Sequence, residues 1–368
     1  MSRPERTVLP TPEHEVPDEK QIREQLRARN IKRGVRIFIL LAVIAAVVVM
    51  VLTVSRETLS GLRQIRWYWL VATIGLWALM TFADGARLSL LSCAGEHRMN
   101  VLQSAEVILA GYFMAAITPF QVGGLPLQLY SMNRWGISPG KATAMLLTRG
   151  ILFYALIFGA APFWAAYLNV SSVLVRALTI YILVVLAFGA FFFILVLFFP
   201  QVIKAWESKL ARKKNPGRIR RLLLRALGEF EHFADGIKLY FKGRNVLYLL
   251  GAFLLTLVYG LSYFGMSASL LAGLGQLDPG ELFKVIGVNN LLVSVLLYIP
   301  TPGASGVAEA GAFGLFLDLK LCDRSMLGVF IVVWRLFSFM LGAMVGGLVA
   351  LRHIARPPDS ATPDPEDK

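Results

Sequence analysis

Five ionisable side chains lie inside long apolar stretches of this sequence. They are Arg87, Glu106, Arg149, Glu309 and Arg335. A charged side chain at the centre of a bilayer costs about 3 kcal/mol on insertion scales, so such residues mark a functional site or an internal pairing. A guanidinium group is a planar fork that matches two phosphate oxygens. We therefore expect the arginines to form an anion site suited to phosphate.

The same residues also have local interpretations. Asp84 and Arg87 stand in the i, i+3 relation of a pair at a helix end, and this explanation is favoured for both. Arg149 could extend its guanidinium to the inner membrane surface. Glu309 could cap the free N–H groups of a new helix, or pair with Arg335 or Arg149. The charged residues expected nearer the interfaces are Asp84, Glu281 and Lys284.

Two segments rich in proline and glycine interrupt the apolar stretches at related points. The first runs from Pro119 to Pro126, and the second from Pro300 to Gly306. A Thr-Pro pair opens both, a polar residue follows each (Gln128, Glu309), and an arginine follows one helix later. The residues expected to break the helices are Pro119, Gly123, Gly124, Pro300, Pro302, Gly303 and Gly306.

The composition places most of the chain in lipid. Hydrophobic residues make up 56% of the 368 residues and charged residues 16%, whereas soluble domains carry about 25% charge. The net charge of +14 lies in tails and loops, which favours positive-inside bias and contact with anionic lipid over nucleic-acid binding. The two cysteines, Cys93 and Cys322, are expected near opposite faces and unbridged. We find no metal-ligand spacing or catalytic signature, and we expect no cofactor and no catalytic residue.

The apolar stretches predict an all-α polytopic membrane protein with about eight transmembrane helices. One transmembrane domain should occupy residues 35–352, between polar cytoplasmic tails at 1–34 and 353–368. A basic loop at 201–245 should also be cytoplasmic, and the basic residues place both termini inside. The predicted apolar stretches are Val35–Val54, Trp67–Leu91, Val101–Thr118, Ala142–Leu168, Ser172–Phe199, Val246–Ala272, Glu281–Ile299, Val307–Leu319 and Met326–Leu351.

The charged loops give a consistent membrane topology only if residues 101–138 and 281–320 each enter the membrane and return to the side from which they came. The two re-entrant hairpins would then face opposite ways, as in the inverted repeats of secondary transporters. Broken backbone at membrane depth must be buried in protein or reached by water, so a polar cavity is expected near the midplane. The alternative is that both segments are ordinary loops or kinks.

The segment Arg218–Phe241 has a wide apolar stripe at helical spacing. It predicts an amphipathic helix, lying either in the headgroup plane or on the inner surface of the protein itself.

The motifs resemble those of the lysylphosphatidylglycerol synthase transmembrane region, a flippase-like family. Pro119, Gly123-Gly124, Gln128, Gly136-Ile-Ser and Arg149 are similar to its first signature, and Ile299–Glu309 is similar to its second. Arg87 also fits. Where the family often has Glu after the first glycine pair, this chain has Pro126 and Gln128, a departure from a symmetric arrangement of two carboxylates.

The resemblance implies a domain in the plasma membrane that moves or binds a lipid. The partner would be an anionic phospholipid, a polyprenyl phosphate or a glycolipid, with substrate-binding roles for Arg87, Glu106, Gln128, Arg149, Glu309 and Arg335. Because the chain ends shortly after its last span, we expect no synthase activity and no enzyme. A membrane-embedded enzyme of a glycolipid or hopanoid pathway and a non-transporting scaffold remain the alternatives, and homo-oligomerisation stays open.

Overall fold

A computed structural model describes residues 65–94, 98–168, 239–297 and 299–355, together with Arg63, Ile180, Leu183, Val184 and Ala187. Several predicted features lie outside the described residues. They are the span Val35–Val54, nearly all of the span Ser172–Phe199, most of the basic loop with its amphipathic helix, the first tail, and the second tail beyond residue 355.

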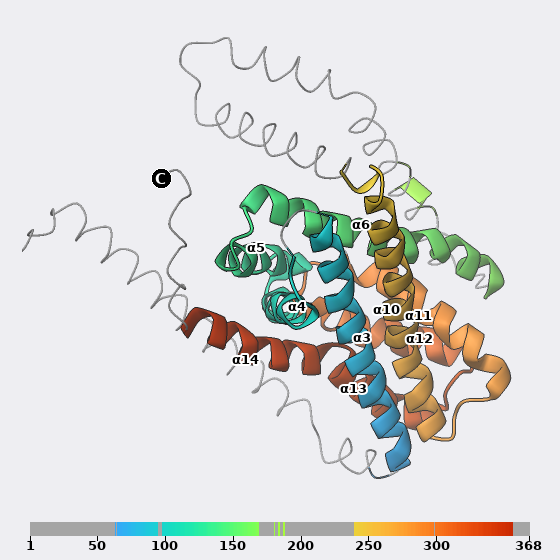
Figure 1. The fold of residues 1–368 in the computed structure, drawn as a ribbon. Helices are drawn as coiled ribbons and strands as arrows, with labels where there is room; N and C mark the ends of the chain where they lie inside the picture. The colour runs from blue at the N-terminus through green and yellow to red at the C-terminus, as the bar shows by residue number, and fades with distance from the viewer. Residues whose placement is uncertain are drawn as a thin grey trace, which may run out of the picture.

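The described residues form helices and no strand, which confirms the all-α prediction (Figure 1). The α-helices are α3 (Trp67–Cys93), α4 (Val101–Ile117), α5 (Gly124–Arg134), α6 (Pro139–Tyr167), α10 (Asn245–Gly273), α11 (Leu282–Leu296), α12 (Val307–Asp318), α13 (Arg324–Arg335) and α14 (Leu341–Ala355). The short 3₁₀ turns are η1 (Pro119–Gln121), η2 (Pro279–Glu281) and η3 (Pro302–Ala304), and η4 (Leu336–Met340) is a π-helical turn between α13 and α14.

Within the described residues, five helical segments are long and apolar enough to cross a membrane. Their ends agree with the predicted spans to within a few residues, because apolar runs and Gly/Pro punctuation set both. One boundary differs. Leu125 and Pro126 were expected in the first irregular segment but belong to the first turn of α5. Proline is tolerated there because the first N–H groups of a helix have no partner within it.

Helices α3 and α10 form a long antiparallel pair (Figure 1). At one end the amide of Arg66 donates to the carbonyl of Gly273 at 3.2 Å. At the other end the hydroxyl of Tyr240 donates to the carbonyl of Leu91 at 3.2 Å. Cys93 therefore lies at the Tyr240 end. Cys322 lies at the Gly273 end, since the amide of Asp323 donates to Gln276 at 2.9 Å. The two cysteines are free and lie at opposite ends, as predicted.

The helix that precedes each break packs on a helix that comes after the break in the other half of the chain. Helix α14 packs on α4, and α6 packs on α11. In both contacts, a glycine of one helix lies close against the neighbouring helix. A Cβ added at Gly346 would lie 1.9 Å from the carbonyl oxygen of Leu109, and one at Gly287 would lie 2.5 Å from the Trp164 ring. Each half is therefore held by a helix of the other.

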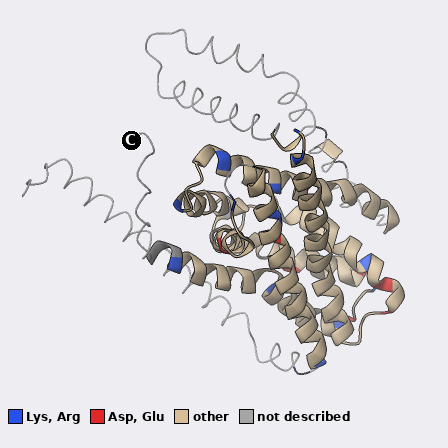
Figure 2. Cartoon of the chain, in the orientation of Figure 1, with Lys and Arg blue, Asp and Glu red and all other residues tan. Residues whose placement is uncertain are grey.

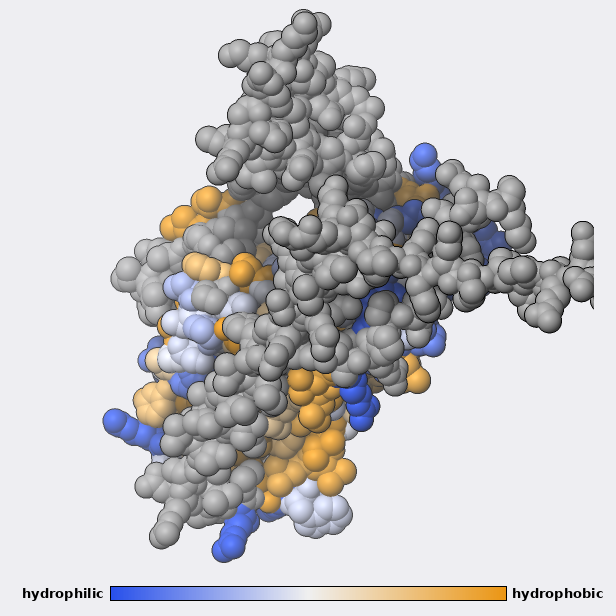
Figure 3. Space-filling model, turned by 90° about the vertical axis from the view of Figure 1, so that its left-hand side faces the viewer, coloured by the Kyte–Doolittle hydropathy of each residue, from blue (hydrophilic) through white to orange (hydrophobic). Residues whose placement is uncertain are grey.

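The outward faces of α3 and α10 are apolar. Large side chains such as Phe82, Leu247, Leu254 and Leu261 are exposed along them. Figure 2 shows long helical stretches without a charged residue, and Figure 3 shows hydrophobic surface on the described part of one face. Soluble monomers rarely expose contiguous apolar surface of this kind. These faces suit contact with lipid tails.

Candidate functional site

The two Pro/Gly segments begin with the same backbone conformation and differ at the glycine before the new helix, where Gly123 is helical and Gly306 has a φ of 85°. In each, an extended threonine (Thr118, Thr301) precedes the proline, and two residues with positive φ follow. These φ values are 53° and 57° at Phe120 and Gln121, and 59° and 55° at Gly303 and Ala304. The residue before a proline disfavours helix, which explains why α4 ends at Ile117. A new helix begins three residues after the second positive φ in each case, at Gly124 and Val307.

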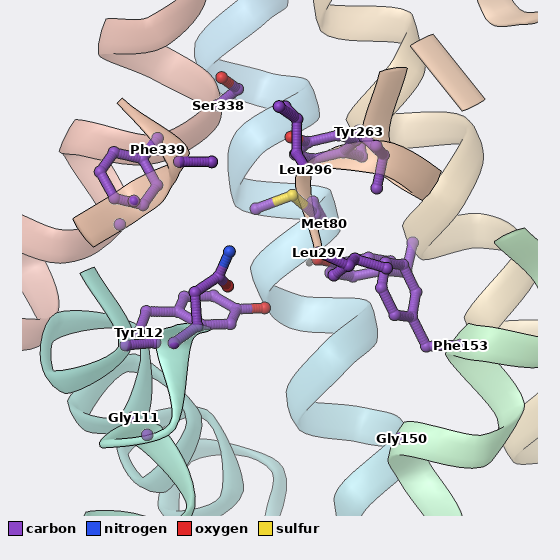
Figure 4. A pocket seen from close by; sticks show the side chains of 18 of the residues that line it. Met80, Gly111, Tyr112, Gly150, Phe153, Tyr263, Leu296, Leu297, Ser338 and Phe339 are labelled. Carbon is purple, nitrogen blue, oxygen red and sulfur yellow. The ribbon is translucent and has the colours of Figure 1, made fainter. Parts of the chain in front are cut away.

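The two breaks meet in the structure and enclose a cavity of about 350 Å³. Turns η1 and η3 contact each other, and residues of α3, α4, α5, α6, α10, α11, α13, η4 and α14 complete the wall. Figure 4 shows Tyr112, Phe153, Tyr263 and Phe339 around this space, on α4, α6, α10 and η4. Among the predicted site residues, those that line the cavity are Arg87, Gly124, Gln128, Arg149, Gly303 and Arg335.

Asp84 holds two of the arginines together on one side of the cavity. Its carboxylate lies 2.5 Å from Nη2 of Arg87 and accepts hydrogen bonds from Nε and Nη2 of Arg149 at 2.8 and 2.7 Å. The hydroxyl of Tyr112 donates to the same carboxylate. Arg87 also donates to Thr256 at 3.2 Å, and its guanidinium lies over the Tyr259 ring, 4.9 Å from the centroid. The predicted pair of Asp84 and Arg87 is confirmed, within a larger network.

One interpretation of this region is wrong. Arg149 does not extend away from the protein, because its Nε and Nη2 bind the two oxygens of the buried Asp84 carboxylate. Asp84 itself is fully buried and lies nine residues before the end of α3 at Cys93.

Arg335 is held at the second break. Its Nε lies 2.8 Å from Oε1 of Glu309, and its Nη2 donates to the carbonyl of Gly303 at 2.8 Å. Oε2 of Glu309 accepts the amide N–H of Gly306 at 2.6 Å. Glu309 therefore caps α12 and pairs with Arg335 at the same time, and Arg149 is not its partner. The π-helical turn η4 begins directly after Arg335 and carries Phe339, whose ring lies under the guanidinium.

Gln128 is buried at the cavity wall, with its carboxamide directly over Gly111. A Cβ at Gly111 would lie 2.2 Å from Nε2 of Gln128, so the glycine lets α4 and α5 approach. Glu106, by contrast, is absent from the described cavity wall, and its predicted substrate-binding role stays a prediction. It precedes Tyr112 by six residues on α4, which puts it about 9 Å away along the axis and on a different side of the helix.

Sequence reasoning missed Asp84 and Tyr112 as site residues. The signal for Asp84 was its place inside an apolar span one turn before Arg87, the same signal that singled out Arg87. Tyr112 offered no signal, because tyrosines are common in apolar helices and its partner lies 28 residues earlier in the chain.

Fold and site together define a multi-pass helical membrane protein with a polar cavity between two broken helical segments. The chain belongs to the family of the lysylphosphatidylglycerol synthase transmembrane region, which matches residues 37–346. It is also similar to a UPF0104 membrane protein of Archaeoglobus fulgidus, with 24% identity over 317 residues, covering 84% of this chain and 94% of that relative.

Proposed function

We propose that this protein is a lipid flippase or scramblase that takes a phosphate-bearing headgroup into its cavity. The observation that carries the proposal is the meeting of the two breaks around a cavity lined by Arg87, Arg149 and Arg335. The lipid tails would stay in the bilayer while the headgroup crosses through the protein. The two breaks would form the re-entrant hairpins of an inverted repeat, which rock on each other to expose the site alternately.

The charges of the site favour an anion. Three arginines line the cavity, and two carboxylates, Asp84 and Glu309, pair with them. Three positive and two negative groups leave one net positive charge in this cluster of described residues. A phosphodiester carries one negative charge and would neutralise it, and a guanidinium fork suits its oxygens.

The proposal extends to location and chemistry. The protein would lie in the plasma membrane with both termini in the cytoplasm, and it would move or bind lipid without making or breaking a covalent bond. Turnover of a lipid-linked donor by a purified sample would contradict the proposal that the protein makes and breaks no covalent bond.

Transbilayer movement of lipid tests the function directly. Purified protein is reconstituted into phosphatidylcholine vesicles that contain phosphatidylglycerol with a fluorophore on its acyl chain. An impermeant reductant should bleach only outer-leaflet label in protein-free vesicles, and nearly all label when the protein is present. Bleaching at the protein-free level, with and without a pH gradient or a potential, would refute the proposal.

Replacing Arg335 by alanine should slow this movement by at least about tenfold, which corresponds to about 1.4 kcal/mol. The variant removes the cation at the second break and leaves Glu309 bound to the Gly306 amide. Arg324→Ala is the matched control, since Arg324 is exposed at the start of α13. Equal rates in the two variants, at equal amounts of folded protein, would remove Arg335 from the site.

A further inference from the structure

The charge distribution on the cavity wall limits which headgroups can enter. Among the described residues that line it, the charged side chains are arginines, and no Asp or Glu belongs to this set. Asp84 and Glu309 are not part of this set, and both already pair with its arginines. Because the three arginines and two carboxylates leave one net positive charge, a headgroup that brings net positive charge of its own would be repelled.

Two aromatic rings of the cavity wall already carry an arginine. A cage for an ammonium group needs free ring faces. The Tyr259 ring carries the Arg87 guanidinium at 4.9 Å, and the Phe339 ring carries that of Arg335 at 4.6 Å. The Tyr112 hydroxyl is also engaged, because it donates to Asp84. The arginines thus occupy the faces of two rings that could otherwise bind an ammonium headgroup.

The remaining wall suits an uncharged polyol. Gln121 and Gln128 offer amide donors and acceptors, and Tyr154 and Tyr263 add hydroxyl groups and ring surface. A volume of about 350 Å³ lies in the range of sites for small organic ligands and exceeds what one phosphate fills. The space beyond the phosphate therefore has amide, hydroxyl, aromatic and aliphatic groups on its wall, and no carboxylate among its described residues.

We infer that the cavity selects anionic headgroups in which the phosphate is joined to an uncharged polyol or sugar, and rejects headgroups that carry an ammonium or aminoacyl group. This inference rests on the proposed function and specifies its substrate class. The proposed substrate class differs from lysylphosphatidylglycerol, the cationic lipid in the family's name. The selecting feature is the absence of a carboxylate on the described wall, and Gln128 is the position where a single isosteric change supplies one.

The test compares phosphatidylglycerol with its lysyl ester, two lipids that differ by the amino acid alone. Both carry the same acyl-chain fluorophore, in separate phosphatidylcholine vesicles with the same protein. We expect phosphatidylglycerol to move at least about tenfold faster, because an unpaired like charge in a cavity is strongly disfavoured. Equal or faster movement of the lysyl ester would overturn the inference and leave the flippase proposal intact. If neither lipid moves, the proposed function fails, and the inference with it.

Gln128→Glu should shift the ratio of the two rates towards the lysyl ester by about tenfold, since it places a carboxylate of equal size on the wall. Gln103→Glu is the control, because Gln103 lies in the capping box of α4 and outside the described cavity wall. An unchanged ratio in folded Gln128→Glu protein would show that wall charge does not set the selectivity, and would overturn the inference.

Discussion

Replacing Asp84 by alanine is expected to destabilise the protein by about 3–5 kcal/mol, the usual cost of removing one partner from a buried ion pair. Asp84 is fully buried and binds both Arg87 and Arg149, whose side chains are 2% and 14% exposed. Its loss leaves two largely buried guanidinium groups at the cavity wall without their carboxylate. The Tyr112 hydroxyl loses its acceptor as well.

The measurement is the free energy of unfolding in mixed micelles, followed by tryptophan fluorescence as denaturing detergent increases. Asp318→Ala serves as the control, since Asp318 is exposed at the end of α12, and its replacement should change stability by less than about 0.5 kcal/mol. If Asp84→Ala unfolds at the same detergent fraction as the control, then water or another group satisfies the arginines, and the network has been misassigned.

Replacing Gly346 by alanine should destabilise the protein by about 3 kcal/mol, at the upper end for overpacking. The new Cβ would lie 1.9 Å from the carbonyl oxygen of Leu109 and 2.7 Å from its carbon. Both atoms are backbone, so no rotamer change relieves the clash, and α14 must move away from α4. Because α4 leads into the first break, lipid movement should fall together with stability.

Gly328→Ala provides the opposite case within the same long helical segment. Nothing lies within 4 Å of a Cβ at Gly328, and alanine is the better helix former by up to about 1 kcal/mol. This variant should be neutral or more stable in the same unfolding measurement. A Gly346→Ala protein as stable as Gly328→Ala would mean that α14 and α4 do not touch as the structure has them.

The sequence was sufficient to locate the helices and the breaks, because both are encoded locally. Apolar length predicts a span, and a Thr-Pro pair followed by glycines ends one. The identical φ pattern after Thr118 and Thr301 goes further than sequence reasoning could, since it occurs at Phe120 and Gln121 in one break and at Gly303 and Ala304 in the other. Because Phe120 in one break corresponds to Gly303 in the other, the two sequences do not indicate that the backbone conformations match here.

The site was predictable only in part, because its contacts join distant segments. Arg149 finds its carboxylate 65 residues earlier, on α3, whereas Arg335 finds Glu309 within the same half of the chain. A search for symmetric partners looks for a carboxylate near Pro126 and Gln128 and so overlooks Asp84. Glu106 was included because it is charged within an apolar stretch, but the residues of α4 that line the described cavity wall are Gly111, Tyr112 and Ala115.

The central claim is that the two breaks enclose a water-filled cavity that a lipid headgroup enters, and cysteine labelling tests it most directly. In a background with Cys93→Ser and Cys322→Ser, single cysteines replace Gln121 in the cavity wall, the exposed apolar residue Leu79 on α3, and the exposed Asp318. An impermeant thiol reagent is applied to both sides of the vesicles. We predict that the cysteine at 121 is labelled in phosphatidylcholine, that phosphatidylglycerol slows this labelling, and that the cysteine at 79 stays unlabelled while that at 318 reacts in both lipids. A cysteine at 121 as unreactive as that at 79 would contradict the account.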